Sequence, residues 1–197
     1  MWALIASDVR AKARWSYQRD DWRAVVKVLL SDGTAAMLLY RFMQGCRHRR
    51  LVPLELCFNK LISLCGGCVI GRGAEFGPGF VLIHSIGVVI NGSVRGGANV
   101  HLEHQVTIGA EGRRSPRLGD DVFVGAGAKI IGGITVGSRT RVGANAVVLA
   151  DVPSDATAVG VPARIIRRGP RRGSQLTAAR TCLDGRDLAA QPEGICQ

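Results

Sequence analysis

Hydrophobic residues recur at every sixth position along the middle of the chain. The series runs over fourteen positions from residue 70 to residue 148, and only Gly112 is neither aliphatic nor aromatic. Its other members are Ile70, Phe76, Leu82, Val88, Val94, Val100, Val106, Leu118, Val124, Ile130, Val136, Val142 and Val148. An α-helix repeats at about 3.6 residues and a strand at about 2, so neither has this period. The period belongs to a larger unit that is stacked on itself.

Six residues suffice for one short strand and one turn, and three such units close a triangular coil of about eighteen residues. Glycine often follows the hydrophobic position, as at Gly71 and Gly125, and small residues such as Ala74 and Ala128 stand four positions after it. Tight corners favour such residues. The pattern looks like the left-handed parallel β-helix of hexapeptide-repeat proteins. We therefore expect a mainly β fold with this coil over residues 68–166 and about four and a half turns.

A helical pattern precedes the coil. Apolar residues follow helical spacing over residues 20–50, around a break at Ser31-Asp32-Gly33, and Asp20 or Asp21 is suited to capping the first turn. A further helix is expected after Pro53. Because a coil with an open end would expose its core, we expect residues 1–67 to form a short α-helical N-terminal region that caps it.

Composition and charge exclude some classes of function. The chain of 197 residues has a formal net charge of +11, but its basic residues are scattered or lie in two short segments, without a recognition helix or an aromatic platform. We expect a phosphorylated cofactor and no nucleic acid. No run reaches the roughly 18 apolar residues of a membrane span, and the N-terminus lacks the order of a signal peptide. We therefore expect a cytoplasmic enzyme with no membrane span, and a basic, flexible tail over residues 167–197.

The six cysteines include one close pair, Cys65-Gly66-Gly67-Cys68. A zinc site would need a second ligand pair, and a redox motif would need a surrounding βαβ pattern. Neither is present, so we expect idle thiols and no metal.

A run of motifs resembles the serine acetyltransferase family and its relatives in polysaccharide gene clusters. The run comprises Gly77-Pro78-Gly79, then Ile83 to Ile90 (IHSIGVVI), then Val106 to Gly109 (VTIG), then Gly125 to Gly132 (GAGAKIIG), and finally Val159 to Ile166 (VGVPARII). The resemblance covers residues 68–166. It implies an acetyl-CoA-dependent O-acetyltransferase that assembles as a homotrimer, with acetyl-CoA between neighbouring coils.

By this resemblance, His84 occupies the position of the catalytic histidine. An alcohol is a poor nucleophile until a base takes its proton, and a neutral imidazole suits that task. His104 is the second candidate, with Glu103 beside it as a further polar group. The backbone N–H groups of Gly109 and Ala110 are candidates for stabilising the oxyanion. His101, which follows the inward Val100, has a weaker claim, and His48, in the basic end of a helix, has none.

The resemblance also implies a cofactor groove. Small residues let the pantetheine arm of acetyl-CoA run close to the backbone, and cations meet its phosphates. The positions that match the family's groove are Gly125, Ala126, Lys129, Arg141, Ala144 and Arg164.

The chain departs from the family at the acceptor. Family members place Asp directly before the catalytic histidine and a second His after an Arg in the loop that interrupts the repeat. Ile83 and Ser115 stand at those positions here. The loop covers residues 110–117, contains Glu111, Arg114 and Ser115, and accounts for Gly112 as an extruded face. Without the Asp, the acceptor hydroxyl is open between serine and a sugar of an exopolysaccharide precursor, and His84 needs another orienting partner, either a backbone carbonyl or Glu103.

Two other functions share this fold. A catalytically silent hexapeptide-repeat trimer would act as a scaffold, as the lost Asp and second His would allow. A γ-type carbonic anhydrase would need three zinc histidines, for which His84, His101 and His104 are the available residues. That function leaves the cofactor motifs unexplained.

Overall fold

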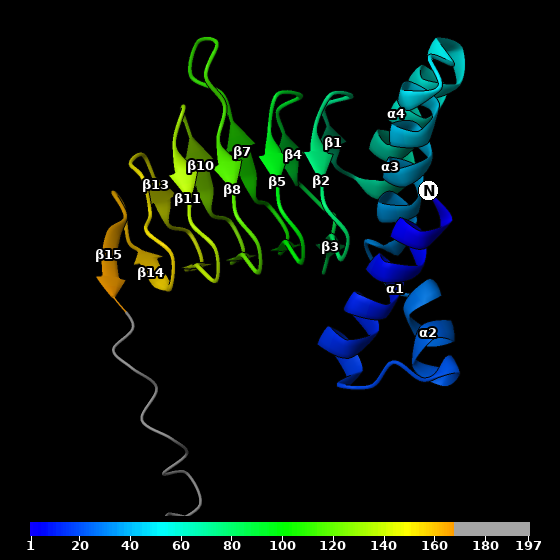
Figure 1. Cartoon of the computed structure of the whole chain (residues 1–197), viewed down its shortest axis with the longest axis horizontal. Coiled ribbons are helices and arrows are strands. Elements are labelled where there is room, and N and C mark those ends of the chain that lie inside the picture. Colours follow the sequence, from blue (N-terminus) through cyan, green and yellow to red (C-terminus); the bar gives the residue numbers. More distant parts are fainter. Residues whose placement is uncertain (168–197) are drawn as a thin grey trace, which may run out of the picture. The chain divides into compact units, whose positions relative to one another are not determined.

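The computed structural model describes residues 1–167, in which four helices precede a series of short strands (Figure 1). The helices are α1 (Trp2–Tyr17), α2 (Trp22–Leu29), α3 (Thr34–His48) and α4 (Val52–Gly66). Asp21 caps α2, since its carboxylate accepts a hydrogen bond of 2.9 Å from the Ala24 N–H. The predicted break at residues 31–33 separates α2 from α3. Apart from Arg167, the tail expected over 167–197 lies outside the described residues.

The sequence interpretation missed α1. Its buried face contains Asp8 and Lys12 beside Val9, Ala11 and Ala13, so charged residues interrupt the hydrophobic stripe that identifies a surface helix. Both charged side chains find partners in other parts of the fold, described below, which is why they can be buried.

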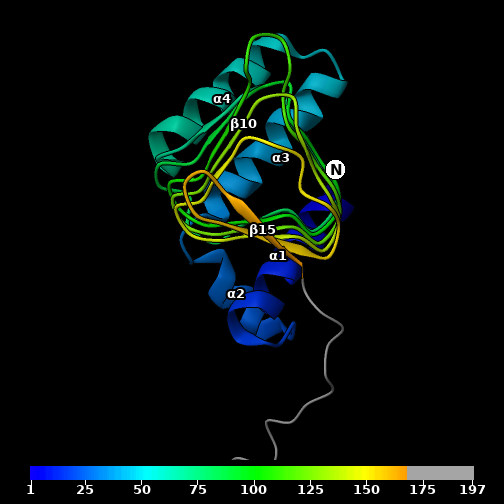
Figure 2. The same ribbon diagram turned by 90° about the vertical axis from the view of Figure 1, so that its left-hand side faces the viewer.

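The strands that follow the helices form a left-handed β-helix with three faces, and Figure 2 shows its triangular cross-section. Face A consists of β1 (Val69–Ile70), β4 (Val89–Ile90), β7 (Thr107–Gly109), β10 (Lys129–Ile131) and β13 (Val147–Val148). Face B consists of β2 (Glu75–Phe76), β5 (Arg95–Gly96), β8 (Arg117–Leu118) and β11 (Thr135–Val136). Face C consists of β3 (Val81–Leu82), β6 (His101–Leu102), β9 (Phe123–Val124), β12 (Arg141–Val142), β14 (Ala156–Val159) and β15 (Arg164–Arg167). All pairings are parallel except β14 with β15.

The interior of the coil is the predicted hydrophobic series. All thirteen apolar members are at most 5% exposed, whereas Gly112 is exposed. Burying an aliphatic side chain contributes about 1.5–3 kcal/mol, so one such residue per face gives a continuous core.

The register corrects one part of the prediction, because the coils do not all contain eighteen residues. Ile70 pairs with Ile90, Ile90 with Ile108, Ile108 with Ile130, and Ile130 with Val148, which gives successive coil lengths of 20, 18, 22 and 18 residues. Two residues are therefore inserted in the first coil and four in the third. Together they equal one repeat unit, so the period returns to its original phase at Leu118.

The two insertions lie at corners. The first falls in residues 83–88, which contain His84, and the second is the loop 110–117. Between them, Ile90, Leu102 and Ile108 occupy the buried strand positions, and Val88 and Val106 immediately precede strands. The strand position of face B is Gly96, where a Cβ would lie 2.3 Å from the Phe76 ring. The six-residue series of the sequence therefore contains two kinds of buried residue. Outside the two insertions its members lie in strands, and between the insertions they immediately precede strands.

The helices are tied to the first coil by buried polar contacts. Arg41 of α3 forms an ion pair with Asp8 of α1, with Nε 2.6 Å from Oδ2, and donates hydrogen bonds to the carbonyls of Phe76 and Gly77. The Asp8 carboxylate accepts a hydrogen bond from the Phe80 N–H. Within residues 1–167, no helix is both long enough and apolar enough to cross a bilayer.

Candidate active site at one corner of the coil

His84 lies at the corner where face C passes into face A. We call this the His84 corner; it comprises residues 83–88, 103–106, 125–128 and 143–146 in four successive coils. Backbone hydrogen bonds join the layers: Gln105 N–H donates to the Ile86 carbonyl (2.9 Å), Gly127 N–H to the His104 carbonyl (2.9 Å) and Asn145 N–H to the Ala126 carbonyl (2.8 Å). The parallel stacking therefore places His84, His104, Ala126 and Ala144 along one edge.

The two histidines of this edge are neighbours. The ring centroids of His84 and His104 are 6.1 Å apart in an edge-to-face arrangement, and each side chain is about half exposed, at 52% and 47%. His104 Nδ1 lies 3.7 Å from the Glu103 carboxylate. The predicted second polar group is thus beside the predicted catalytic histidine, and Glu103 faces His104.

The carboxylate nearest to His84 is one that the sequence interpretation did not assign. Asp32 lies in the turn between α2 and α3, and its Oδ2 is 3.5 Å from His84 Nδ1. The break at residues 31–33 was visible in the sequence, but nothing in the pattern indicates that this turn lies against a strand fifty residues away. Only the packing of the helices on the first coil brings it there.

Lys12 connects that turn to the strand before His84. Its buried ammonium donates hydrogen bonds to the Asp32 carbonyl and to the Leu82 carbonyl, the latter at 2.8 Å. Burial lowers the pKa of Lys12 to about 8, although the Asp32 charge opposes this shift. At neutral pH Lys12 is therefore still mostly protonated, and it holds two segments of backbone together.

The residues expected to hold the cofactor fall into two groups. Gly125, Ala126 and Ala144 lie at the His84 corner, and Lys129 of face A reaches back to it, where its Nζ donates to the Gln105 carbonyl at 2.7 Å. Arg141 and Arg164 instead belong to face C; the Arg141 guanidinium lies 4.5 Å from the Phe123 ring centroid. Residues 160–163 close the corner, since the Ala163 N–H donates to the Val147 carbonyl at 2.8 Å.

The residues expected to bind the acceptor lie at a different corner. The loop 110–117 extends from the junction of faces A and B and is visible beyond β7 and β8 in Figure 1. Glu111 and Arg114 pair through their backbones to close the loop, and both side chains are exposed, as the extruded face predicts. Ser115 lies 3.2 Å from the Asn91 amide oxygen. Gly109 and Ala110, the expected oxyanion donors, lie where β7 ends and this loop begins. Within one chain, the loop and His84 therefore do not converge.

Other sequence candidates are separated from this site. His101 is packed on the outside of face C against Trp15, with ring centroids 5.0 Å apart; its Nε2 is buried, and burial lowers its pKa to about 4. Among residues 1–167 there is no group of three or more His, Cys, Asp or Glu side chains arranged to hold a metal ion.

The cysteines of residues 1–167 are free thiols, and burial raises the pKa of Cys68 to about 11, so this thiol is neutral. Cys182 and Cys196 lie outside the described residues.

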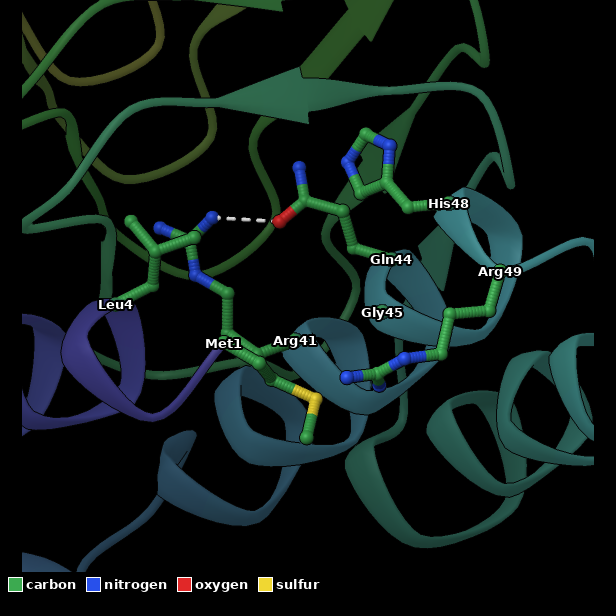
Figure 3. A pocket seen from close by; sticks show the side chains of 7 residues that line it. All are labelled: Met1, Leu4, Arg41, Gln44, Gly45, His48 and Arg49. Atoms are coloured by element: carbon green, nitrogen blue, oxygen red, sulfur yellow. Dashed lines mark hydrogen bonds between the residues drawn. The ribbon is translucent and has the colours of Figure 1, made fainter.

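A separate cavity of about 190 Å³ lies between α1 and α3 (Figure 3). It is lined by Met1, Leu4, Arg41, Gln44, Gly45, His48 and Arg49. Its buried polar groups are paired with one another, since Arg41 donates to the Gln44 side-chain oxygen at 2.8 Å. His48 lies here and not near His84.

Comparison with known proteins places this geometry in context. Residues 115–150 match the family model of the bacterial transferase hexapeptide (six repeats). The serine acetyltransferase of Helicobacter pylori strain J99 is 40% identical over 154 residues, which cover 76% of this chain and 88% of that protein.

Solved structures of serine acetyltransferases are also similar to this chain. Serine acetyltransferase from Neisseria gonorrhoeae superposes with a TM-score of 0.77 at 30% identity, covering 85% of this chain and 65% of that one. A serine acetyltransferase in complex with CoA has a TM-score of 0.75 at 33% identity, covering 83% and 68%. The Neisseria protein is also known in complex with serine, in a structure similar to this one. Since the coil, the helices before it and the sequence over most of the chain all match these proteins, this chain belongs to the serine acetyltransferase family.

Proposed function

We propose that this protein transfers the acetyl group of acetyl-CoA to the side-chain hydroxyl of serine, with His84 as the general base. The observation that carries the proposal is the His84 corner, where an exposed histidine and a column of small residues share one edge of the coil. The similarity to a serine acetyltransferase in complex with CoA, and to one in complex with serine, supports both substrates. Because acetyl-CoA and serine are cytoplasmic metabolites, we place the reaction in the cytoplasm.

The reaction needs one proton transfer in each direction. His84 takes the proton of the hydroxyl as its oxygen attacks the thioester carbonyl carbon. Backbone N–H groups at Gly109 and Ala110 of a neighbouring subunit stabilise the tetrahedral oxyanion. The intermediate then expels the CoA thiolate, which receives the proton from His84. The products are O-acetylserine and CoA, and no metal is required.

The cofactor runs along the same edge. Gly125, Ala126 and Ala144 leave room for the pantetheine arm, and Lys129 supplies a cation beside it. Arg141 and Arg164 meet the phosphates from face C.

We further propose that the active protein is a homotrimer. His84 and the loop 110–117 lie at two different corners, so one subunit cannot bring its own Arg114 to its own His84. In a ring of three, the loop of one subunit meets the His84 corner of the next. Exposed apolar residues support such contacts, since Val69, Ile86 and Val89 at or near this edge are 51%, 67% and 42% exposed.

Arg114 is suited to the carboxylate of serine, and Glu111 to its ammonium group. Ile83, half-buried beside His84, and Ser115 in the loop provide no charge, which favours a sugar hydroxyl as the second candidate acceptor. Release of thiol from acetyl-CoA should be measured with serine, homoserine, hexoses and nucleotide sugars. We expect the highest rate with serine; a higher rate with a sugar would reassign the acceptor, and no release with any of them would favour a silent scaffold.

The role of His84 is tested by His84→Ala. We expect kcat for thiol release to fall by about 10²–10⁴-fold, the usual contribution of general-base catalysis. The matched control is His48→Ala, which removes an exposed histidine of α3 and should leave kcat unchanged. An unchanged rate in His84→Ala would remove His84 from the mechanism.

A further inference from the structure

We propose that Asp32 is a positioning residue that orients the His84 imidazole through Nδ1, and that Lys12 holds Asp32 in place. This rests on the proposed role of His84 as the general base. It provides the orienting partner for which the sequence offered only a backbone carbonyl or Glu103. The partner comes from the helical segment and not from the coil.

The geometry assigns one carboxylate to each histidine. Asp32 Oδ2 lies 3.5 Å from His84 Nδ1, and Glu103 Oε2 lies 3.7 Å from His104 Nδ1. Glu103 is therefore engaged by the neighbouring ring. The Asp32 side chain is 75% exposed, so a small rotation brings it to hydrogen-bonding distance of His84 without moving a packed group.

A carboxylate at this position has a definite chemical effect. By accepting a hydrogen bond from Nδ1–H, it fixes the tautomer in which Nε2 has a free lone pair. That nitrogen can then take the hydroxyl proton, and the carboxylate stabilises the imidazolium that forms. In this role Asp32 acts through His84 and does not contact the substrate.

The turn that contains Asp32 is fixed against the strand before His84. Lys12 donates to the carbonyl of Asp32, which directly precedes Gly33 in the chain, and to the carbonyl of Leu82, which stands two residues before His84. Gly33 has a φ of +75°, and a Cβ there would lie 2.5 Å from the Leu82 carbonyl oxygen. No residue larger than glycine fits between the turn and the Leu82 carbonyl, so Gly33 allows the turn to lie close to His84.

The competing role for Asp32 is direct binding of the serine ammonium group, which would replace the missing Asp at Ile83. The two roles predict different kinetics. Loss of a positioning residue lowers kcat, whereas loss of a binding contact present in both ground state and transition state raises KM.

The experiment compares Asp32→Asn, Asp32→Ala and Asp32→Glu in the full-length protein. We expect both Asn and Ala to lower kcat by about 10²-fold with KM for serine changed by less than about 3-fold, and Glu to recover kcat to within about 10-fold of the wild type. The matched control is Asp20→Asn, because Asp20 is an exposed aspartate of the same helical segment, paired with Arg14 at 3.5 Å. It should leave both constants unchanged.

A second measurement is independent of turnover. In protein labelled with ¹⁵N at the histidine rings, the His84 signal, assigned by its loss in His84→Gln, should show the proton on Nδ1 in the wild type. Asp32→Ala should move it to Nε2, the intrinsically preferred site. If the wild type releases no thiol but shows this tautomer, the proposed function fails and the pairing stands. A preserved kcat, an effect on KM alone, or an unchanged tautomer would overturn the role of Asp32.

Lys12→Met tests the other half of the proposal. We expect it to lower kcat as Asp32→Asn does, and the double variant to be no worse than Asp32→Asn alone, because both changes disrupt the same unit. Circular dichroism checks that each variant is folded. Additive losses in folded variants would show that Lys12 acts separately from Asp32.

Discussion

Lys12 is a buried charged side chain that joins two segments of the backbone. Its ammonium is surrounded by backbone carbonyls from two segments, the turn at Asp32 and the strand at Leu82. Burial of a charged amine is unfavourable unless such acceptors are present. The burial penalty still exceeds the gain, because the pKa of Lys12 is lowered from its ordinary 10.5 to about 8.

This shift predicts a pH dependence of stability. Between pH 8 and 10.5 the unfolded chain keeps the Lys12 proton while the folded protein loses it, so the free energy of unfolding rises with pH across that window. The two values, 10.5 and about 8, correspond to about 3 kcal/mol over the whole window. Urea unfolding of the wild type and Lys12→Met at pH 7.5 and 10 measures it. We expect the rise between these two pH values to be larger in the wild type by about 2.5 kcal/mol, because they span most of the window; equal slopes would show that Lys12 titrates normally.

At the residue scale the sequence predicts His84 and His104 as candidates but does not predict which groups surround them. The motif around His84 is local, so it could be read from consecutive residues. Asp32 stands 52 positions from His84, and Lys12 stands 70 positions from Leu82, and no periodic pattern relates them. Their contribution depends on where α1 and the turn before α3 lie on the coil, which only the folded structure determines.

At the element scale, the link between the helices and the coil depends on the pair of Asp8 and Arg41. Both side chains are nearly fully buried, and between them they bond to the backbone at Phe76, Gly77 and Phe80. Three parts of the fold, α1, α3 and β2 with the turn that follows it, therefore depend on one ion pair.

Breaking this pair should cost more than any exposed ion pair. We expect Asp8→Asn or Arg41→Met to lower the free energy of unfolding by about 3–5 kcal/mol, because each leaves a buried polar partner uncompensated. The double variant should lose much less than the sum. Urea unfolding gives the coupling energy from the double-mutant cycle. The exposed pair of Arg14 and Asp20 is the control and should show weak coupling; equal coupling in both cycles would contradict the structural role of the buried pair.

The elements were predictable to different degrees. Strands β1 to β3 and β8 to β13 could be predicted because each buries one residue of the six-residue series, whereas β4 to β7 each follow a member of it. Helices α2 to α4 could be predicted because they have helical spacing, a cap or a proline in the first turn. α1 was missed because Asp8 and Lys12 occupy its buried face. The coil lengths of 20 and 22 were hidden because the two insertions restore the phase.

At the scale of the whole molecule, the division of the site between two corners leads to a mixing experiment. His84→Ala and Arg114→Ala should each be nearly inactive. Co-refolding them in equal amounts should restore about a quarter of the wild-type rate, because in a random ring one interface in four combines an intact His84 with an intact loop. Each variant refolded alone is the control.

Sedimentation equilibrium should give three times the chain mass of 21.0 kDa. A 21.0 kDa species that is fully active would refute the shared site.

The loop 110–117 has a consequence for how this protein can change. The turn at its tip is closed by the backbone pair of Glu111 and Arg114, and the strands on either side, β7 and β8, keep their pairing with the coils above and below. A change in the length of the loop is therefore absorbed where it occurs. In the proposed function this loop binds the acceptor, so a change in its length should change acceptor preference while the strands of the coil keep their pairing. Segments from relatives with other acceptors can therefore be grafted at this position.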